Sequence, residues 1–218
     1  ELLKDIATKN GVGCYDVLTG FKFIAETIRS LEGIKTFIGG GEESYGYLVG
    51  DFVRDKDAVI ACAMIAEAAA WAADRGKSFF DLLIEMYVEF GLYKEKLKSI
   101  TKKGQTGAEE IQAMMLNYRK TPPVKIADQL VIEIRDYKLR KSFKLQLGTE
   151  KKIELPISDV IQFFLADGSK ITVRPSGTEP KIKFYFGVMA PLSGKDAYDE
   201  VNQELDLKVD RIIQSLGL

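Results

Sequence analysis

Residues 166–186 read ADGSKITVRPSGTEPKIKFYF, and their pattern decides the fold of the C-terminal part of the chain. Alternating apolar and polar residues at 170–173 and again at 181–188 predict two strands. Between these strands the segment RPSGTEP contains a glycine and two prolines, which favour a turn over a continued strand. We therefore expect a strand, a polar loop and a second strand in direct succession.

The RPSGTEP loop has the side chains that a phosphate group requires. Arg174 can offer a charged, bidentate fork, and Ser176 and Thr178 can donate hydroxyl protons. Gly177 allows backbone N–H groups to turn toward an anion. Lys183, in the exit strand, can add charge at the rim. The alternative is a polar hairpin loop without a ligand, and the whole heptapeptide favours the phosphate site.

Further strands are expected on either side of this hairpin, at 129–134, 142–147 and 160–165. A helix at 108–118 precedes them, and a charged helix at about 196–216 closes the chain. A helix, a run of mainly antiparallel strands and a second helix make a smaller α+β domain with flanking helices.

The first part of the chain alternates helix and strand instead. Helices are expected at 2–8, 21–31, 58–73 and 77–90, and strands at 11–18 (GVGCYDVL), 35–38 (KTFI) and 92–101 (LYKEKLKSIT). That order predicts an α/β layer with helices packed on a sheet. We place the boundary near 104–106, which gives domains at 1–104 and 105–218.

A second polar stretch, GEESYG at 41–46, follows the expected strand at 35–38. It sets the carboxylates of Glu42 and Glu43 and the hydroxyl of Ser44 on a glycine-rich turn. Taken alone, such an acid pair suggests metal binding or general acid–base chemistry.

Composition limits the classes of partner. The 218 residues are 46% hydrophobic and 29% charged, as in an ordinary soluble globular protein, and 31 Lys and Arg balance 32 Asp and Glu. The nearly neutral net charge therefore gives no long-range electrostatic attraction to nucleic acid or to an anionic membrane. Cys14 and Cys62 lack metal spacing, and we expect reduced core thiols and a cytoplasmic protein.

The apolar run at 58–73 is too short for a membrane span, and we expect a buried helix there. The N-terminus has neither the pattern of a signal peptide nor an initiator methionine. The chain is therefore expected to be a piece of a longer protein.

Four motifs together resemble those of the α-D-phosphohexomutase family: VLTGFK at 17–22, GEESYG, RDKD at 54–57 and RPSGTEP. The order and spacing agree over nearly the whole chain, which is similar to the C-terminal half of a phosphoglucomutase or phosphomannomutase, namely most of the third domain and the fourth. The resemblance implies an enzyme in which a phosphoserine phosphorylates a hexose monophosphate. The 1,6-bisphosphate then turns over in the cleft and returns the other phosphate.

The resemblance also implies roles for individual residues. Glu42 and Ser44 would hold sugar hydroxyls, Thr19 and Gly20 would belong to a loop that distinguishes the orientation of the sugar, and the role of Glu43 stays open. The phosphate pocket would contain Arg174, Ser176, Gly177 and Thr178, with Lys183 as an outer member.

Lys56 matches a lysine that reaches the reacting phosphate in related glucomutases, as an electrostatic stabiliser or a proton-transfer partner. We expect Asp55 to cap the following helix, which puts Lys56 in its first turn, where it would oppose the helix dipole. Helix stability therefore does not explain why a lysine stands at this position. The alternative is a solvated surface lysine, and Arg54 is either a substrate contact or a rim charge.

Two parts of the family's active site are missing from the sequence. There is no histidine, so the serine–histidine segment is absent, and no DGDxDR magnesium motif occurs. We expect this chain to bind no metal and to be inactive by itself. Mg²⁺, the N-terminal domains and glucose 1,6-bisphosphate would belong to the full-length parent.

The expected substrates are glucose 1-phosphate and glucose 6-phosphate, because Gly46 stands where bifunctional phosphomannomutases have a histidine. Mannose phosphates and pentose phosphates remain as alternatives. A stand-alone phosphosugar-binding module is an alternative of another class, and nucleic-acid binding is disfavoured by the balanced charge.

Overall fold

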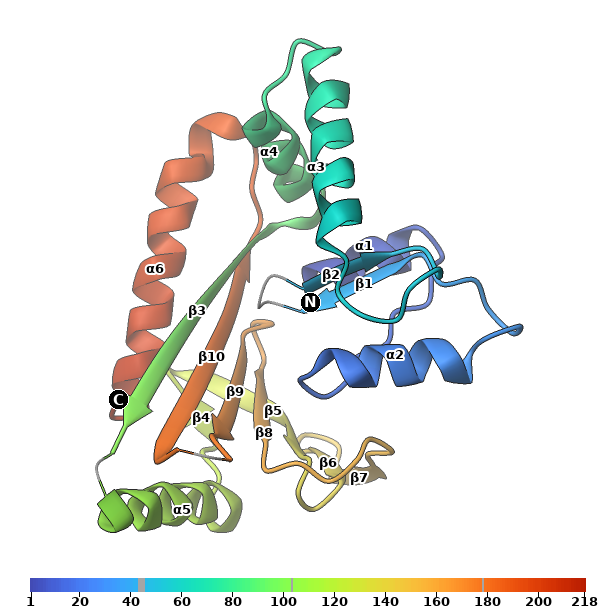
Figure 1. The fold of residues 1–218 in the computed structure, drawn as a ribbon. Helices are drawn as coiled ribbons and strands as arrows, with labels where there is room; N and C mark the ends of the chain where they lie inside the picture. The colour runs from blue at the N-terminus through green and yellow to red at the C-terminus, as the bar shows by residue number, and fades with distance from the viewer. Residues whose placement is uncertain (43–45, 103, 178) are drawn as a thin grey trace. The chain divides into compact units, whose positions relative to one another are not determined.

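The computed structural model describes residues 1–42, 46–102, 104–177 and 179–218, which form two compact units. The N-terminal unit extends as far as Met86, and the C-terminal unit runs from Tyr87 to Leu218. The fold is α/β, as the sequence predicts, and its elements are labelled in Figure 1. In the described residues no helix is long and apolar enough to cross a bilayer.

The N-terminal unit consists of helices around a short hairpin. Its helices are α1 (Leu2–Lys9), α2 (Phe21–Ser30) and α3 (Ala58–Ala73), followed by α4 (Phe79–Phe90), which continues into the second unit. The strands β1 (Gly39–Glu42) and β2 (Gly46–Val49) pair antiparallel. A small core of Phe21, Ile28 and Leu48, with Ile24 and Phe37 at its edge, holds α2 against the hairpin.

Two strands that the sequence predicts in this unit do not form where they are expected. Residues 12–18 have no regular structure, and the strand expected at 35–38 begins only at Gly39. Alternation within four to eight residues indicates a strand only where a partner supplies hydrogen bonds. The three glycines of β1 are extended because β2 pairs with them, although glycine disfavours strands on its own.

The helix expected to be buried, α3, is exposed along most of its length. Ala72 is its one buried residue, whereas Val59 is 81% and Ile65 60% accessible. The expectation that Cys14 and Cys62 are core thiols is wrong as well, since both are exposed. Hydrophobicity on all sides predicts burial, but burial also requires elements that cover each side.

The C-terminal unit contains an antiparallel sheet with strand order β3-β10-β9-β8-β5-β6-β7 over the described residues, and β4 pairs with β5 off this path. The strands are β3 (Leu92–Thr101), β4 (Lys125–Ile126), β5 (Gln129–Asp136), β6 (Lys141–Lys144), β7 (Thr149–Lys152), β8 (Ile161–Leu165), β9 (Lys170–Pro175) and β10 (Lys181–Ala190). The mainly antiparallel sheet predicted from alternation is confirmed.

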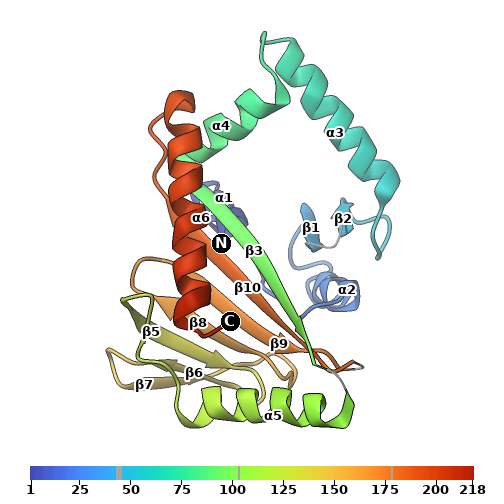
Figure 2. The same ribbon diagram turned by 90° about the vertical axis from the view of Figure 1, so that its left-hand side faces the viewer.

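Two helices accompany this sheet, α5 (Gly104–Lys120) and α6 (Tyr198–Ser215), the second preceded by a 3₁₀ turn at Lys195–Ala197. Tyr118 of α5 makes edge-to-face contacts with Phe163 and Phe184 on the buried face of the sheet. Helix α6 runs along β3 and β10 (Figures 1 and 2), and ion pairs from Lys94 to Asp206 and from Lys96 to Asp210 hold it to β3.

Strand β3 belongs to the C-terminal unit, whereas the boundary expected from the sequence places it in the first domain. The sequence boundary near 104–106 puts residues 92–101 in the first domain, whereas β3 pairs over its whole length with β10, from Leu92 opposite Ala190 to Thr101 opposite Lys181. The structure divides the chain before β3, because this pairing joins segments that lie far apart in sequence.

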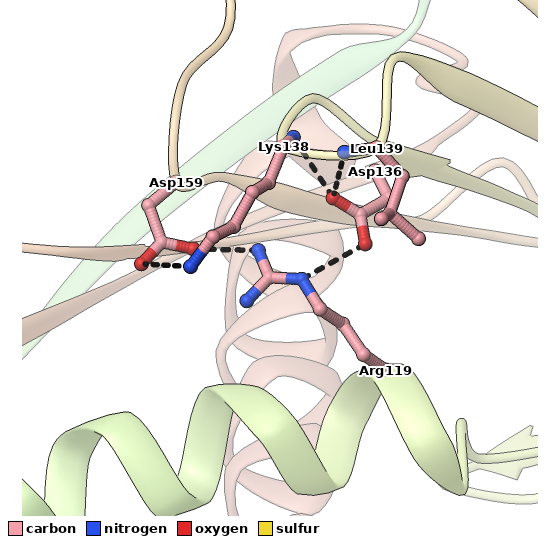
Figure 3. A network of polar contacts seen from close by, with 5 residues as sticks. All are labelled: Arg119, Asp136, Lys138, Leu139 and Asp159. Carbon is pink, nitrogen blue, oxygen red and sulfur yellow. Dashed lines mark hydrogen bonds and ion pairs between the residues drawn. The ribbon is translucent and has the colours of Figure 1, made fainter.

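A buried ion-pair network fixes one end of the sheet (Figure 3). Arg119, at the end of α5, donates to Asp136 at 2.9 Å and to Asp159 at 2.6 Å. The other oxygen of Asp136 accepts the backbone N–H groups of Lys138 and Leu139. Burial would lower the pKa of Arg119, but the hydrogen bonds to Asp159 and Asp136 outweigh it and raise the pKa. The network thus joins α5 to the end of β5 and to the residues before β8.

Candidate functional site

The RPSGTEP segment connects β9 to β10 as expected. Ser176 N–H donates to the carbonyl of Lys181 at 2.7 Å, and Lys181 N–H donates to the carbonyl of Glu179 at 2.7 Å. The Ser176 hydroxyl accepts the N–H of Glu179 at 3.3 Å. The carbonyl of Pro180 accepts the N–H of Lys102, just after β3, at 2.8 Å. The backbone of this connection is therefore held at several points.

Arg174 and Lys183 lie directly opposite each other at the base of this connection. Both side chains are half-buried, and within the described residues neither forms an ion pair. Like charges opposite each other in a sheet are destabilising. An anion between them would remove this repulsion, so the arrangement is suited to binding one.

Gly177 is exposed, and a β-carbon built on it would meet nothing within 4 Å. The loop therefore has open space at its tip, where a ligand can approach the backbone. The prediction for Thr178 lies outside the described residues. Of the predicted phosphate contacts, the structure brings Arg174, Ser176, Gly177 and Lys183 to one end of the β9–β10 pair.

The GEESYG segment joins the two strands of the N-terminal hairpin. Glu42 is the last residue of β1, is half-buried, and lies opposite Gly46, the buried first residue of β2. The predictions for Glu43 and Ser44 lie outside the described residues. Glu42 is therefore the predicted sugar contact of this segment whose position the structure describes.

Lys56 precedes helix α3, so the expectation that it lies in the first turn of that helix is wrong. The N-cap of α3 is Asp57, whose side chain accepts the N–H groups of Val59 at 2.9 Å and Ile60 at 3.0 Å. Asp55, the expected cap, instead accepts the N–H of Lys56 at 2.7 Å, which is the main cause of its lowered pKa. Lys56 therefore lies outside the first turn of α3 and does not oppose the helix dipole from within it.

The stem of Lys56 lies against the hairpin. A β-carbon on Gly46 would be 2.8 Å from Cδ of Lys56 and 2.9 Å from Cγ of Glu42, so both side chains border the same point. The ammonium of Lys56 is 5.1 Å from the centre of the Phe21 ring and 3.2 Å from Asp55 Oδ1. The structure thus brings Glu42 and Lys56, predicted from separate motifs, to one place.

Phe21 begins α2 and directly follows Thr19 and Gly20. Gly20 is the N-cap residue, with a φ of 121° that residues with a side chain rarely adopt. Thr19 is exposed, and Phe21 is buried in the core beneath the hairpin. The start of α2 is therefore close to the ammonium of Lys56, and three of the four motifs meet in this unit.

Arg54 has structural partners. Its guanidinium donates to the backbone carbonyl of Asp51 and forms an ion pair with Glu32 at 3.2 Å. These contacts connect the loop before α3 to the segment after α2. The sequence allows two roles for Arg54, a substrate contact or a charge at the rim of the site, and these contacts favour the second.

The sequence does not indicate that Gly46 and Phe21 belong to the site. The one signal for Gly46 is its position two residues after Ser44, and this position only distinguishes types of mutase. In the described part of the chain no three His, Cys, Asp or Glu side chains gather as metal ligands. The described residues therefore offer no cluster that fits a magnesium site.

Known families match both units. The family described as phosphoglucomutase/phosphomannomutase, alpha/beta/alpha domain III, matches residues 1–90, and the C-terminal domain of the same family matches residues 102–191. The chain is 38% identical over 205 residues to a phosphoglucomutase of Staphylococcus haemolyticus and 39% identical over 209 residues to one of Staphylococcus aureus. These alignments cover 94% and 96% of this chain.

The chain spans little more than a third of these relatives, 36% and 37% of their lengths. Among solved structures, the open form of the exocytosis-sensitive phosphoprotein pp63/parafusin from Paramecium, described as a phosphoglucomutase, matches with a TM-score of 0.62. That match covers 99% of this chain and 37% of the other at 19% identity, and it supports the fold alone. The chain belongs to the phosphoglucomutase/phosphomannomutase family and contains its domain III, at residues 1–90, and its C-terminal domain, at residues 102–191.

Proposed function

We propose that this chain supplies the sugar-binding and phosphate-binding half of a phosphoglucomutase that interconverts glucose 1-phosphate and glucose 6-phosphate. The relatives with 38–39% identity, which are named phosphoglucomutases, carry this proposal. Arg174 and Lys183, which form no ion pair with the residues that the structure describes, support it from the structure, because two such cations side by side suit a phosphate group.

In this proposal the RPSGTEP loop holds the phosphate that is not reacting. Arg174 and Lys183 supply the charge, while Ser176, Gly177 and Thr178 supply hydroxyl and backbone donors. The substrate must bind in two opposite orientations, since each phosphate reacts in turn. One fixed pocket that accepts either phosphate meets this requirement.

The N-terminal unit would hold the sugar. The carboxylate of Glu42 would accept hydrogen bonds from sugar hydroxyls, and the hydroxyl of Ser44 would donate to them or accept from them. Thr19 and Gly20 would contact the sugar according to its orientation. Lys56 would stabilise charge on the reacting phosphoryl group. Its position beside Glu42 supports this role, because one ligand could then reach both side chains.

The remaining chemistry would belong to other parts of the parent protein. These parts would contribute the phosphoserine and the Mg²⁺ site, with glucose 1,6-bisphosphate as the intermediate, so this chain alone would be inactive. Exposed apolar side chains on α3, among them Val59, Ile65 and Trp71, offer a surface that other segments of the parent could cover. The two exposed, unpaired cysteines suit a reducing compartment such as the cytoplasm.

The test is a substrate comparison with the full-length parent. Its kcat/KM is measured for glucose 1-phosphate, mannose 1-phosphate and ribose 1-phosphate, with glucose 1,6-bisphosphate present. We expect glucose 1-phosphate to be preferred. A preference for mannose or pentose phosphate would replace the proposed substrate, and no turnover of any of the three would overturn the proposed function.

A further inference from the structure

The contact between Gly46 and Lys56 suggests a requirement that neither motif shows by itself. A β-carbon at position 46 would lie 2.8 Å from Cδ and 2.9 Å from Cγ of Lys56, and 2.9 Å from Cγ of Glu42. Non-bonded carbon atoms prefer about 3.5–4.0 Å. Any side chain at this position would therefore displace one or both of its neighbours.

Backbone conformation does not explain the glycine. Gly46 is the first residue of strand β2, and extended strand backbone is a conformation that any L-residue can adopt. It is paired with Glu42 in a regular antiparallel register, where glycine is a weak choice. What the glycine provides is space for the stem of Lys56.

The course of Lys56 is fixed at both ends. The next residue, Asp57, donates its backbone N–H to the carbonyl of Tyr47 at 2.8 Å, which holds the start of the side chain beside β2. At the other end the ammonium lies 5.1 Å from the centre of the Phe21 ring, at the start of α2. The stem between these points crosses Gly46.

We propose that Gly46 is a positioning residue of the sugar site: its missing side chain allows Lys56 to lie across the hairpin, with its stem beside Glu42 and its ammonium at the start of α2. This inference rests on the proposed function, because it assigns Lys56 and Glu42 to one ligand. The new element is that the size of the residue at position 46 determines whether the ammonium of Lys56 can reach the start of α2. If a relative has a larger residue at position 46, its equivalent of Lys56 must follow a different course.

The test is a double-mutant cycle in the full-length parent, with Gly46→Ala, Lys56→Ala and the double variant. We expect Gly46→Ala to lower kcat/KM for glucose 1-phosphate about tenfold, mainly through kcat. In the Lys56→Ala background the same change should cost at most a third as much, because two of the three crowded atoms are gone. An equal fold-change in both backgrounds, or no loss in the single variant, would overturn the inference.

Gly40→Ala is the matched control. It adds a β-carbon to the same hairpin, where the nearest atoms, from Ile24 and Phe37, lie at ordinary contact distances of 3.4 and 3.5 Å. We expect its kcat/KM to remain within about twofold of wild type. A comparable loss in this control would assign the effect to the hairpin in general.

A crystal structure of the Gly46→Ala parent gives a readout that does not depend on activity. The inference predicts that the ammonium of Lys56 leaves the face of Phe21 while α2 and the hairpin keep their fold. An unmoved lysine would contradict it, even in an active enzyme. A wild-type parent without mutase activity would instead overturn the proposed function, together with the role assigned to the lysine.

Discussion

Lys183 lies directly opposite Arg174 in the antiparallel pair of β9 and β10, and within the described residues neither side chain has an acidic partner. Two like charges in this register cost stability unless an anion lies between them. Positions that favour ligand binding over stability are typical of functional sites. The pair is therefore the strongest structural sign of a phosphate site in this chain.

Lys183→Ala should change stability and activity in opposite directions. We expect the free energy of unfolding to rise by about 0.2–1 kcal/mol, because the repulsion with Arg174 is removed. In the parent, KM for glucose 1-phosphate should rise several-fold. Chemical denaturation and steady-state kinetics measure the two effects. Lys181→Ala is the control, since Lys181 lies opposite Thr101, and a loss of stability in Lys183→Ala would contradict the account.

Asp57→Ala should destabilise α3 by about 1 kcal/mol, because its carboxylate caps two N–H groups of the first turn. Asp55→Ala removes a carboxylate that accepts no N–H group of the helix among its described contacts, and it should leave the denaturation midpoint unchanged. Urea denaturation of the two variants separates them. A larger effect for Asp55→Ala would restore the cap that the sequence suggested.

Arg119→Ala should destabilise the C-terminal unit by about 3–5 kcal/mol, because it leaves Asp136, only 4% exposed, without its counter-charge. Lys138→Ala is the matched control. Its ammonium is 3.9 Å from the same Asp159 but the side chain is 51% exposed, so we expect a loss of about 0–1 kcal/mol. Thermal unfolding followed by circular dichroism measures both, and equal losses would count against the network as a structural anchor.

Glu133 should make stability depend on acid pH. Its burial would raise the pKa of the carboxyl, but hydrogen bonds from Arg135 and Ser142 outweigh this and lower the pKa in the folded state. The folded protein therefore binds the proton less readily than the unfolded chain. The stabilisation is complete above the ordinary glutamate pKa of about 4.3 and is lost as pH falls below it.

Glu133→Gln should accordingly reduce stability at pH 7 and flatten its decline between about pH 5 and 3. Urea denaturation at a series of pH values measures the slope. The control is Glu150→Gln, which removes an ion pair with Lys141 in which both side chains are about half exposed. An unchanged slope in Glu133→Gln would show that another group determines the acid response.

The centre of the sheet in the C-terminal unit was predictable from its sequence, because buried and partly exposed residues alternate along β8, β9 and β10. Ile182, Phe184 and Phe186 are buried while the residues between them are not, as the spacing predicts. The strands β4 and β7 were missed, since β7 is exposed throughout and has no apolar alternation. The pairing of β3 with β10 is long-range and leaves no local signal.

The N-terminal unit was harder to predict for a physical reason. Its β1 strand is GGGE, which gains its extended form from pairing with β2 and shows no strand propensity. Sequence motifs identified the candidate site residues, but they did not predict which of these residues lie close together in space. Lys56 precedes the helix because Asp57 is the N-cap residue, whereas the sequence pattern favoured Asp55 as the cap.

The central claim, that RPSGTEP binds the phosphate of a hexose phosphate, is tested most directly by Arg174→Ala in the full-length parent. Steady-state kinetics with glucose 1-phosphate give KM and kcat for the variant and the wild type. Loss of a charged hydrogen bond predicts that kcat/KM falls about 10- to 100-fold, with circular dichroism unchanged. Unchanged KM and kcat in the variant would contradict the claim.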